Sequence, residues 1–151
     1  MKCLSILLFL NLAFSNPTET LNFNGTWVSS GDNFENKLIL EKIEDKQNRY
    51  RFVFYGWRTS YDSFTKQDIK FSGEMNDEIF IIDIKNNKAN YSDDGRQFEE
   101  GWNLYRKGEE RCRVYFEFCR NSIKVETNSC SMIYGGFGVS FDGQYKKINY
   151  S

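Results

Sequence analysis

The pattern of side chains between residues 112 and 127 constrains the fold more than any other stretch of the sequence. Residues 112–118 alternate strictly, so apolar and polar side chains fall on opposite faces of an expected strand. A turn at residues 120–122 leads to residues 123–127, which alternate in the same way, and the two segments together predict a β-hairpin. The apolar face of that hairpin consists of Cys112, Val114, Phe116, Phe118, Ile123 and Val125.

The cysteine positions predict that this hairpin is closed covalently. Cys112 opens its first strand and Cys130 follows its second, so strand pairing brings the two residues level, near the Cα separation of about 5.5 Å that suits a disulfide. A Cys112–Cys130 bridge is therefore favoured over the alternative bridge from Cys119 to Cys130. It would leave Cys119 as an unpaired thiol. No CxxC spacing and no histidine accompany these cysteines, so we expect no metal site.

The first fifteen residues have the organisation of a secretory leader. Lys2 provides the positive start, residues 4–10 the apolar core, and Ala13-Phe14-Ser15 the cleavage site. We therefore expect residues 1–15 to be a signal peptide, removed together with Cys3, and residues 16–151 to be a single β-barrel domain. Its expected location is secreted or periplasmic, where disulfides form. No later segment approaches the ~18 apolar residues of a membrane span.

Period-two alternation recurs in short segments along the rest of the chain. Further expected strands are residues 25–29, 38–43, 50–55, 69–72, 79–84, 89–91 and 139–145. Residues 79–84 are apolar on both faces, which is typical of a central strand, and residues 98–105 are expected to form a short helix. The expected fold class is all-β: a single antiparallel up-and-down β-barrel or a compact sandwich of about eight strands.

Charge and histidine content exclude several classes of function. The chain carries 20 Lys and Arg residues against 21 Asp and Glu residues, interspersed throughout, and this argues against a nucleic-acid partner. It contains no histidine, which excludes Ser-His and Cys-His nucleophilic pairs and histidine general bases. Its paired carboxylates fall in expected turns, where solvated surface charge is the simpler interpretation. We therefore expect a non-enzymatic protein with no catalytic residues and no cofactor.

Two sets of residues resemble known barrel families. Gly25-Thr26-Trp27 resembles the Gly-x-Trp that opens the first strand of lipocalins and avidins, although a core tryptophan entering any first strand would look the same. The C-terminal half resembles small exported bacterial proteins related to the periplasmic lysozyme inhibitors and to other calycin-like modules. That second resemblance consists of Lys88-Ala89-Asn90-Tyr91, Cys112-x-Val114-x-Phe116, Ile123-x-Val125, Cys130 and Gly138-Val139-x-x-Asp142-Gly143-x-Tyr145-Lys146. It implies a compact barrel that binds something in the cell envelope, such as a lysozyme.

Two aromatic segments are the candidate contact surfaces. Residues 55–64 are expected to form a loop, and Trp57, Arg58 and Tyr61 within it are residue types that often dominate binding energy. Residues 98–106 add Trp102 and Tyr105 beside two glutamates, a combination that suits a cationic protein partner. The alternative interpretation is that these rings pack over the ends of the barrel.

Two functions of different classes follow from these observations. The first is an exported, non-catalytic binding protein of the cell envelope, which resembles a lysozyme inhibitor and requires a filled barrel. The second is a carrier of a small apolar ligand, of lipocalin or avidin type, with an open cavity lined by residues such as Phe52, Phe54, Ile81 and Phe116. The volume of the barrel interior distinguishes the two.

Overall fold

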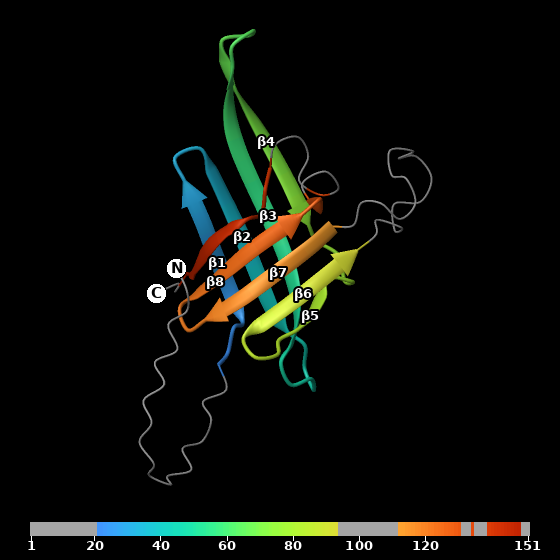
Figure 1. Ribbon diagram of the computed structural model, residues 1–151. Helices are drawn as coiled ribbons and strands as arrows, with labels where there is room; N and C mark the ends of the chain where they lie inside the picture. Colours follow the sequence, from blue (N-terminus) through green and yellow to red (C-terminus); the bar gives the residue numbers. More distant parts are fainter. Residues whose placement is uncertain (1–20, 94–111, 131–133, 135–138, 149–151) are drawn as a thin grey trace, which may run out of the picture.

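The computed structural model describes residues 21–93, 112–130, 134 and 139–148, and these residues form an antiparallel all-β structure (Figure 1). The expected fold class is confirmed. The strands are β1 (Gly25–Gly31), β2 (Phe34–Lys42), β3 (Arg49–Asp62), β4 (Gln67–Met75), β5 (Ile81–Asp83), β6 (Lys88–Asp93), β7 (Cys112–Cys119), β8 (Ser122–Asn128) and β9 (Gly143–Lys147).

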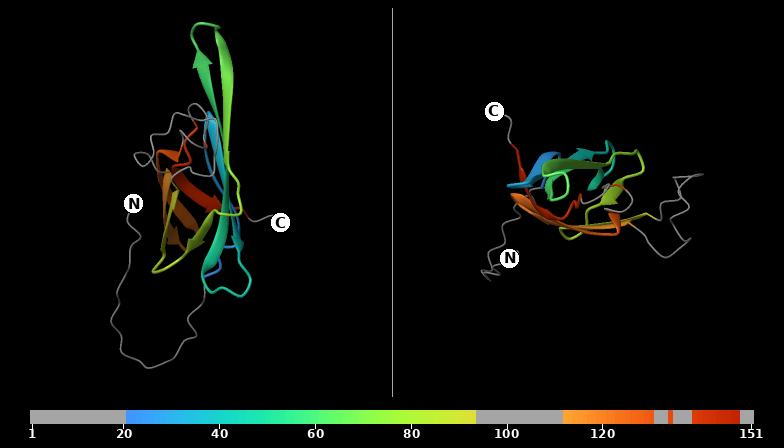
Figure 2. Two further views of the ribbon diagram at one scale, coloured as in Figure 1. Left: turned by 90° about the vertical axis from the view of Figure 1, so that its right-hand side faces the viewer. Right: turned by 90° about the horizontal axis from the view of Figure 1, so that it is seen from above.

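The strands form one curled sheet in which neighbours in the chain are mostly neighbours in space. The order is β4-β3-β2-β1-β9-β8-β7-β6, and β5 pairs with one end of β3 at residues 49–51. A turn with a bridge between Lys85 and Lys88 then leads from β5 to β6. Figures 1 and 2 show the consequence: β6 to β9 lie across the face of β1 to β4, and the arrangement is consistent with an up-and-down barrel.

The space between the two layers is filled by side chains from alternate strand positions. In β7 the even positions are buried and Arg113 and Tyr115 are exposed, so the predicted alternation is confirmed. Aromatic rings from both layers meet: the ring centroid of Phe54 lies 6.1 Å from that of Phe116 and 5.1 Å from that of Phe141. The largest fully buried side chains are Trp27, Tyr145, Phe52, Phe54, Phe80, Phe118 and Phe141.

The predicted bridge between Cys112 and Cys130 is present, with Cα atoms 4.3 Å apart. The hairpin of β7 and β8 brings the two cysteines together: Arg113 pairs with Asn128, which puts Cys112 level with Ser129, and Cys130 follows one residue later. The expectation of a leftover thiol is wrong, since Cys119 also takes part in a disulfide.

Two expected strands differ from the structure. The pattern of residues 79–84 predicts a central strand, but β5 is three residues long and its outward side chains, including Ile81, are exposed. Among the described residues, β5 pairs with β3 alone and its outer face meets no second layer, while Phe80 and Ile82 turn inward. In residues 139–145 the strand begins only at Gly143. The leader, the glycines at 135–138 and the helix expected at 98–105 lie outside the described residues.

Candidate functional site

The β3–β4 hairpin extends beyond the rest of the barrel, and it carries the candidate site. The expectation of a loop at residues 55–64 is wrong: β3 continues as a strand to Asp62, paired with β4 from Phe54 opposite Met75 to Asp62 opposite Gln67. Figure 2 shows this hairpin projecting past the other strands. Only residues 63–66 form the turn.

Strand geometry separates the three predicted contact residues that the structure describes. Successive side chains of a strand point to opposite faces, so Trp57 and Tyr61 share the outer face of β3 with Tyr55. Arg58 lies on the opposite face, where it lines a cavity of about 270 Å³ that Phe34 and also Trp57 help to form. The predicted cluster is therefore divided between two faces. Trp102 and Tyr105 lie outside the described residues.

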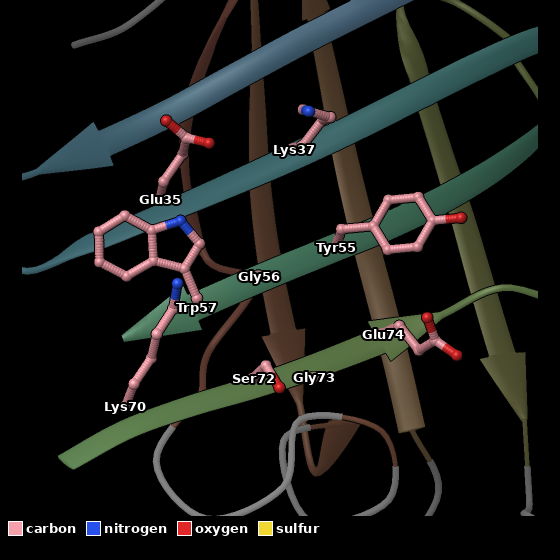
Figure 3. Close-up of a pocket in the computed structure, with 9 residues that line it drawn as sticks. All are labelled: Glu35, Lys37, Tyr55, Gly56, Trp57, Lys70, Ser72, Gly73 and Glu74. Carbon is pink, nitrogen blue, oxygen red and sulfur yellow. The ribbon is translucent and has the colours of Figure 1, made fainter. Parts of the chain in front are cut away.

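The outer face of β2, β3 and β4 forms a groove of about 370 Å³, which we call the outer groove (Figure 3). Its side chains come from alternate positions of three adjacent strands: Glu35 and Lys37 of β2, Tyr55 and Trp57 of β3, and Lys70, Ser72 and Glu74 of β4. Figure 3 shows the rings of Tyr55 and Trp57 face-on, lying over the sheet with one face of each ring turned outward. The groove thus combines two aromatic faces with a rim of charged and hydroxyl groups.

Contacts within and beside the outer groove hold both rings. The Nζ atom of Lys70 lies over the Trp57 ring, 4.8 Å from its centroid, in a cation–π arrangement. On the other side, the Tyr55 hydroxyl accepts a hydrogen bond of 3.0 Å from the side-chain amide of Asn76. The Asn76 Oδ1 atom in turn accepts a bond of 2.8 Å from Arg51. The orientation of Tyr55 is therefore set by a chain of polar contacts through Asn76, which directly follows β4, to Arg51 of the same strand as Tyr55.

The end of the β3–β4 hairpin presents apolar side chains to solvent. Phe64 is 97% exposed and Tyr61 64% exposed, and Ile69 on β4 is also exposed. We call these three residues the hairpin tip. Asp62 organises the turn, because its carboxylate accepts hydrogen bonds from the Phe64 N–H at 2.9 Å and from the Thr65 hydroxyl at 2.8 Å. Those two bonds hold the pKa of Asp62 below its usual range.

The sequence did not identify three residues of this region as contact residues: Tyr55, Phe64 and Lys70. Tyr55 could have been found from its two-residue spacing to Trp57, had residues 55–62 been read as a strand. Phe64 follows Asp62 by two residues, a spacing typical of a side chain that caps a turn. No local signal identifies Lys70, because its contact with Trp57 depends on the register of β4 against β3.

Over the described ranges, no group of three or more His, Cys, Asp and Glu side chains is arranged to hold a metal ion. The same part of the chain contains no helix with the length and apolar character needed to cross a membrane. Comparisons of the chain with protein-family models, with curated proteins and with solved structures find no match. The function is therefore inferred from the residues and their geometry.

Proposed function

We propose that this chain is an exported, non-catalytic protein-binding module that engages its partner with the hairpin tip. Two features support export. The Cys112–Cys130 disulfide is typical of oxidising compartments, and the pattern of residues 1–15 is that of a leader.

The observation that carries the proposal is the exposure of Phe64 on a projecting, organised turn. A fully exposed phenylalanine gains the hydrophobic contribution of its side chain, about 1.5–3 kcal/mol, only when a partner buries it. Because the Asp62 carboxylate already holds the turn, little conformational entropy is lost on binding. Tyr61 and Ile69 are also exposed at this end of the hairpin, on opposite faces of it, so each face adds an apolar side chain next to the turn. These are properties of an anchor that inserts into an apolar cleft of another protein.

The barrel interior supports a protein binder over a carrier of a small apolar ligand. Three of the four residues expected to line a cavity, Phe52, Phe54 and Phe116, pack against one another instead. The centroid of the Phe52 ring lies 5.7 Å from that of Phe54 and 5.3 Å from that of Phe116. The fourth, Ile81, faces outward. In the described part of the barrel these rings occupy the space that a ligand would need.

The partner that we propose is a cationic hydrolase such as a lysozyme. The resemblance of the C-terminal half to envelope proteins of that kind supports this choice. Asp68 lies opposite Tyr61 in the β3–β4 register, on the same face, and this acidic neighbour suits a cationic rim.

The test is a titration of the purified protein against a panel of lysozymes, and separately against apolar fluorescent ligands. We expect binding of at least one lysozyme, and a loss of about tenfold or more in affinity in Phe64→Ala and in Tyr61→Ala. Ile79→Ala is the matched control, because Ile79 is an exposed apolar residue away from the tip, and it should leave the affinity unchanged. Uptake of an apolar ligand without protein binding would favour the carrier, and failure of both titrations would contradict both functions.

A further inference from the structure

The outer groove has a chemistry different from that of the hairpin tip. Glu35 and Glu74 contribute two negative charges, and Lys37 and Lys70 contribute two positive charges, so the groove carries no net charge. A polyanion or a polycation would meet as much repulsion as attraction there. The balance of charges instead suits a neutral ligand that carries many hydrogen-bonding groups. Carboxylates accept hydrogen bonds, ammonium groups donate them, and the Ser72 hydroxyl does both.

The floor of the outer groove adds a second requirement on the ligand. Tyr55 and Trp57 are two residues apart on β3, so their Cα atoms are about 6.6 Å apart along the strand, and both rings turn a face outward (Figure 3). A ligand that covers both rings needs flat apolar faces, repeated along its length, together with polar edges. A pyranose sugar has this form, because its C–H groups make an apolar face and its hydroxyls project from the edge.

The two rings are held in place before any ligand arrives. The hydrogen bond from Asn76 to the Tyr55 hydroxyl fixes one ring, and the ammonium of Lys70 over the indole holds the other. The Lys70 ammonium over Trp57 is the end of a flexible side chain, so a ligand can displace it. After displacement it can still donate a hydrogen bond to a ligand hydroxyl. Preorganisation of the Tyr55 ring reduces the entropy lost on binding, whereas the contact of Lys70 with Trp57 is given up when a ligand stacks on the indole.

From these observations we propose that the outer groove is a binding site for a neutral oligosaccharide, with pyranose rings stacked on Trp57 and Tyr55. The rim residues Glu35, Lys37, Lys70 and Glu74 bond the hydroxyls. This site is separate from the hairpin tip and does not depend on the proposed protein partner. Because the groove is shallow and open, we expect dissociation constants of about 0.1–10 mM.

The experiment is a calorimetric and NMR titration of the purified full chain with neutral tetrasaccharides. The panel contains β-linked oligomers of glucose, of N-acetylglucosamine and of mannose, and an α-linked glucose oligomer. We expect at least one of them to bind, with Trp57→Ala and Tyr55→Ala each weakening the affinity by about tenfold or more. Trp57→Phe keeps a ring and should retain part of the affinity, which protects the test if the alanine variant folds poorly.

Tyr115→Ala is the matched control. Tyr115 is also an exposed aromatic on the outer face of a sheet, lined there by Lys88, Glu117, Lys124 and Glu126, but it lacks a second ring two residues along its strand. This variant and Phe64→Ala should bind the saccharide like the parent. The proposal is overturned if no tetrasaccharide binds, if Trp57→Ala binds unchanged, or if Tyr115→Ala loses as much affinity. Loss of lysozyme binding alone would contradict only the proposed function.

Discussion

Phe54 of β3 and Phe116 of β7 stack across the interior of the barrel, with their ring planes 8° apart and centroids separated by 6.1 Å. The two residues belong to opposite layers, and Phe54 also contacts Phe141 and Tyr145. The aromatic residues that are so frequent in this chain thus join the layers to one another. This contact is the structural reason for favouring a filled barrel over an open one.

Replacement of Phe54 by alanine should be among the most destabilising changes in the described part of the chain. It removes a fully buried ring that contacts residues from both layers, so we expect a loss of about 3–5 kcal/mol in the free energy of unfolding. Urea denaturation measures the change. Phe64→Ala deletes the same side chain at an exposed position and should change stability by no more than about 0.5 kcal/mol. Equal losses in the two variants would contradict the packing described here.

The Cys112–Cys130 bridge closes a separation of 18 residues and should contribute substantially to stability. A double variant, Cys112→Ala with Cys130→Ala, leaves Cys119 unchanged and should lose about 3 kcal/mol, because the unfolded chain is no longer constrained. The measurement is the thermal unfolding midpoint, compared with that of the parent under the same oxidising conditions. An unchanged midpoint would show that the bridge does not stabilise the fold.

The β7–β8 hairpin and its disulfide could be predicted from the sequence because one face of each strand is buried. Burial on one face and solvent on the other produce the alternation seen in residues 112–118, and they also fix the register that brings Cys112 and Cys130 together. The prediction therefore needed only local information.

The β3–β4 hairpin could not be predicted in the same way. Beyond Trp57 both of its faces are solvated, so the side chains of residues 58–62 show no alternation between apolar and polar, and the segment resembles a loop. Without the strand, the sequence gives no indication that Trp57 and Arg58 occupy opposite faces. Trp57 and Tyr61 could be predicted as contact residues, but their grouping with Tyr55 depends on long-range pairing with β2 and β4.

Gly56 provides a test of the buried polar contact beneath the outer groove. A Cβ atom at this position would lie 2.5 Å from Oδ1 of Asn36, a buried side chain that donates a 2.7 Å hydrogen bond to the Ser140 carbonyl. Gly56→Ala should therefore cost about 1–3 kcal/mol by forcing the amide to move. Asn36→Ala also destabilises, but the double variant should lose less than the sum of the two, since the clash with Asn36 is then absent and the closest remaining approach is 3.0 Å, to Cγ1 of Val139. Additive losses in a urea-denaturation cycle would contradict this coupling.

Asp62 should control the order of the hairpin tip without controlling the stability of the barrel. Asp62→Ala removes the acceptor of the Phe64 N–H, so hydrogen exchange at that amide should become about fivefold faster or more, while the unfolding midpoint stays unchanged. Asp62→Asn keeps an acceptor oxygen and should retain part of the protection. An unchanged exchange rate in Asp62→Ala would show that the carboxylate does not hold the turn.

The same contact predicts a dependence on pH. The pKa of Asp62 is lower in the folded turn than in a disordered one, so the ionised carboxylate stabilises the turn. This contribution is complete above the ordinary carboxyl pKa of about 4, and it is lost as the pH falls through the lower value of the folded turn. Protection of the Phe64 amide, expressed relative to the exchange rate of an unstructured peptide at each pH, should decrease over that acidic range in the parent. In Asp62→Asn, which carries no titrating group at this position, the protection should stay constant, and a parallel decrease in both proteins would assign the effect to another group.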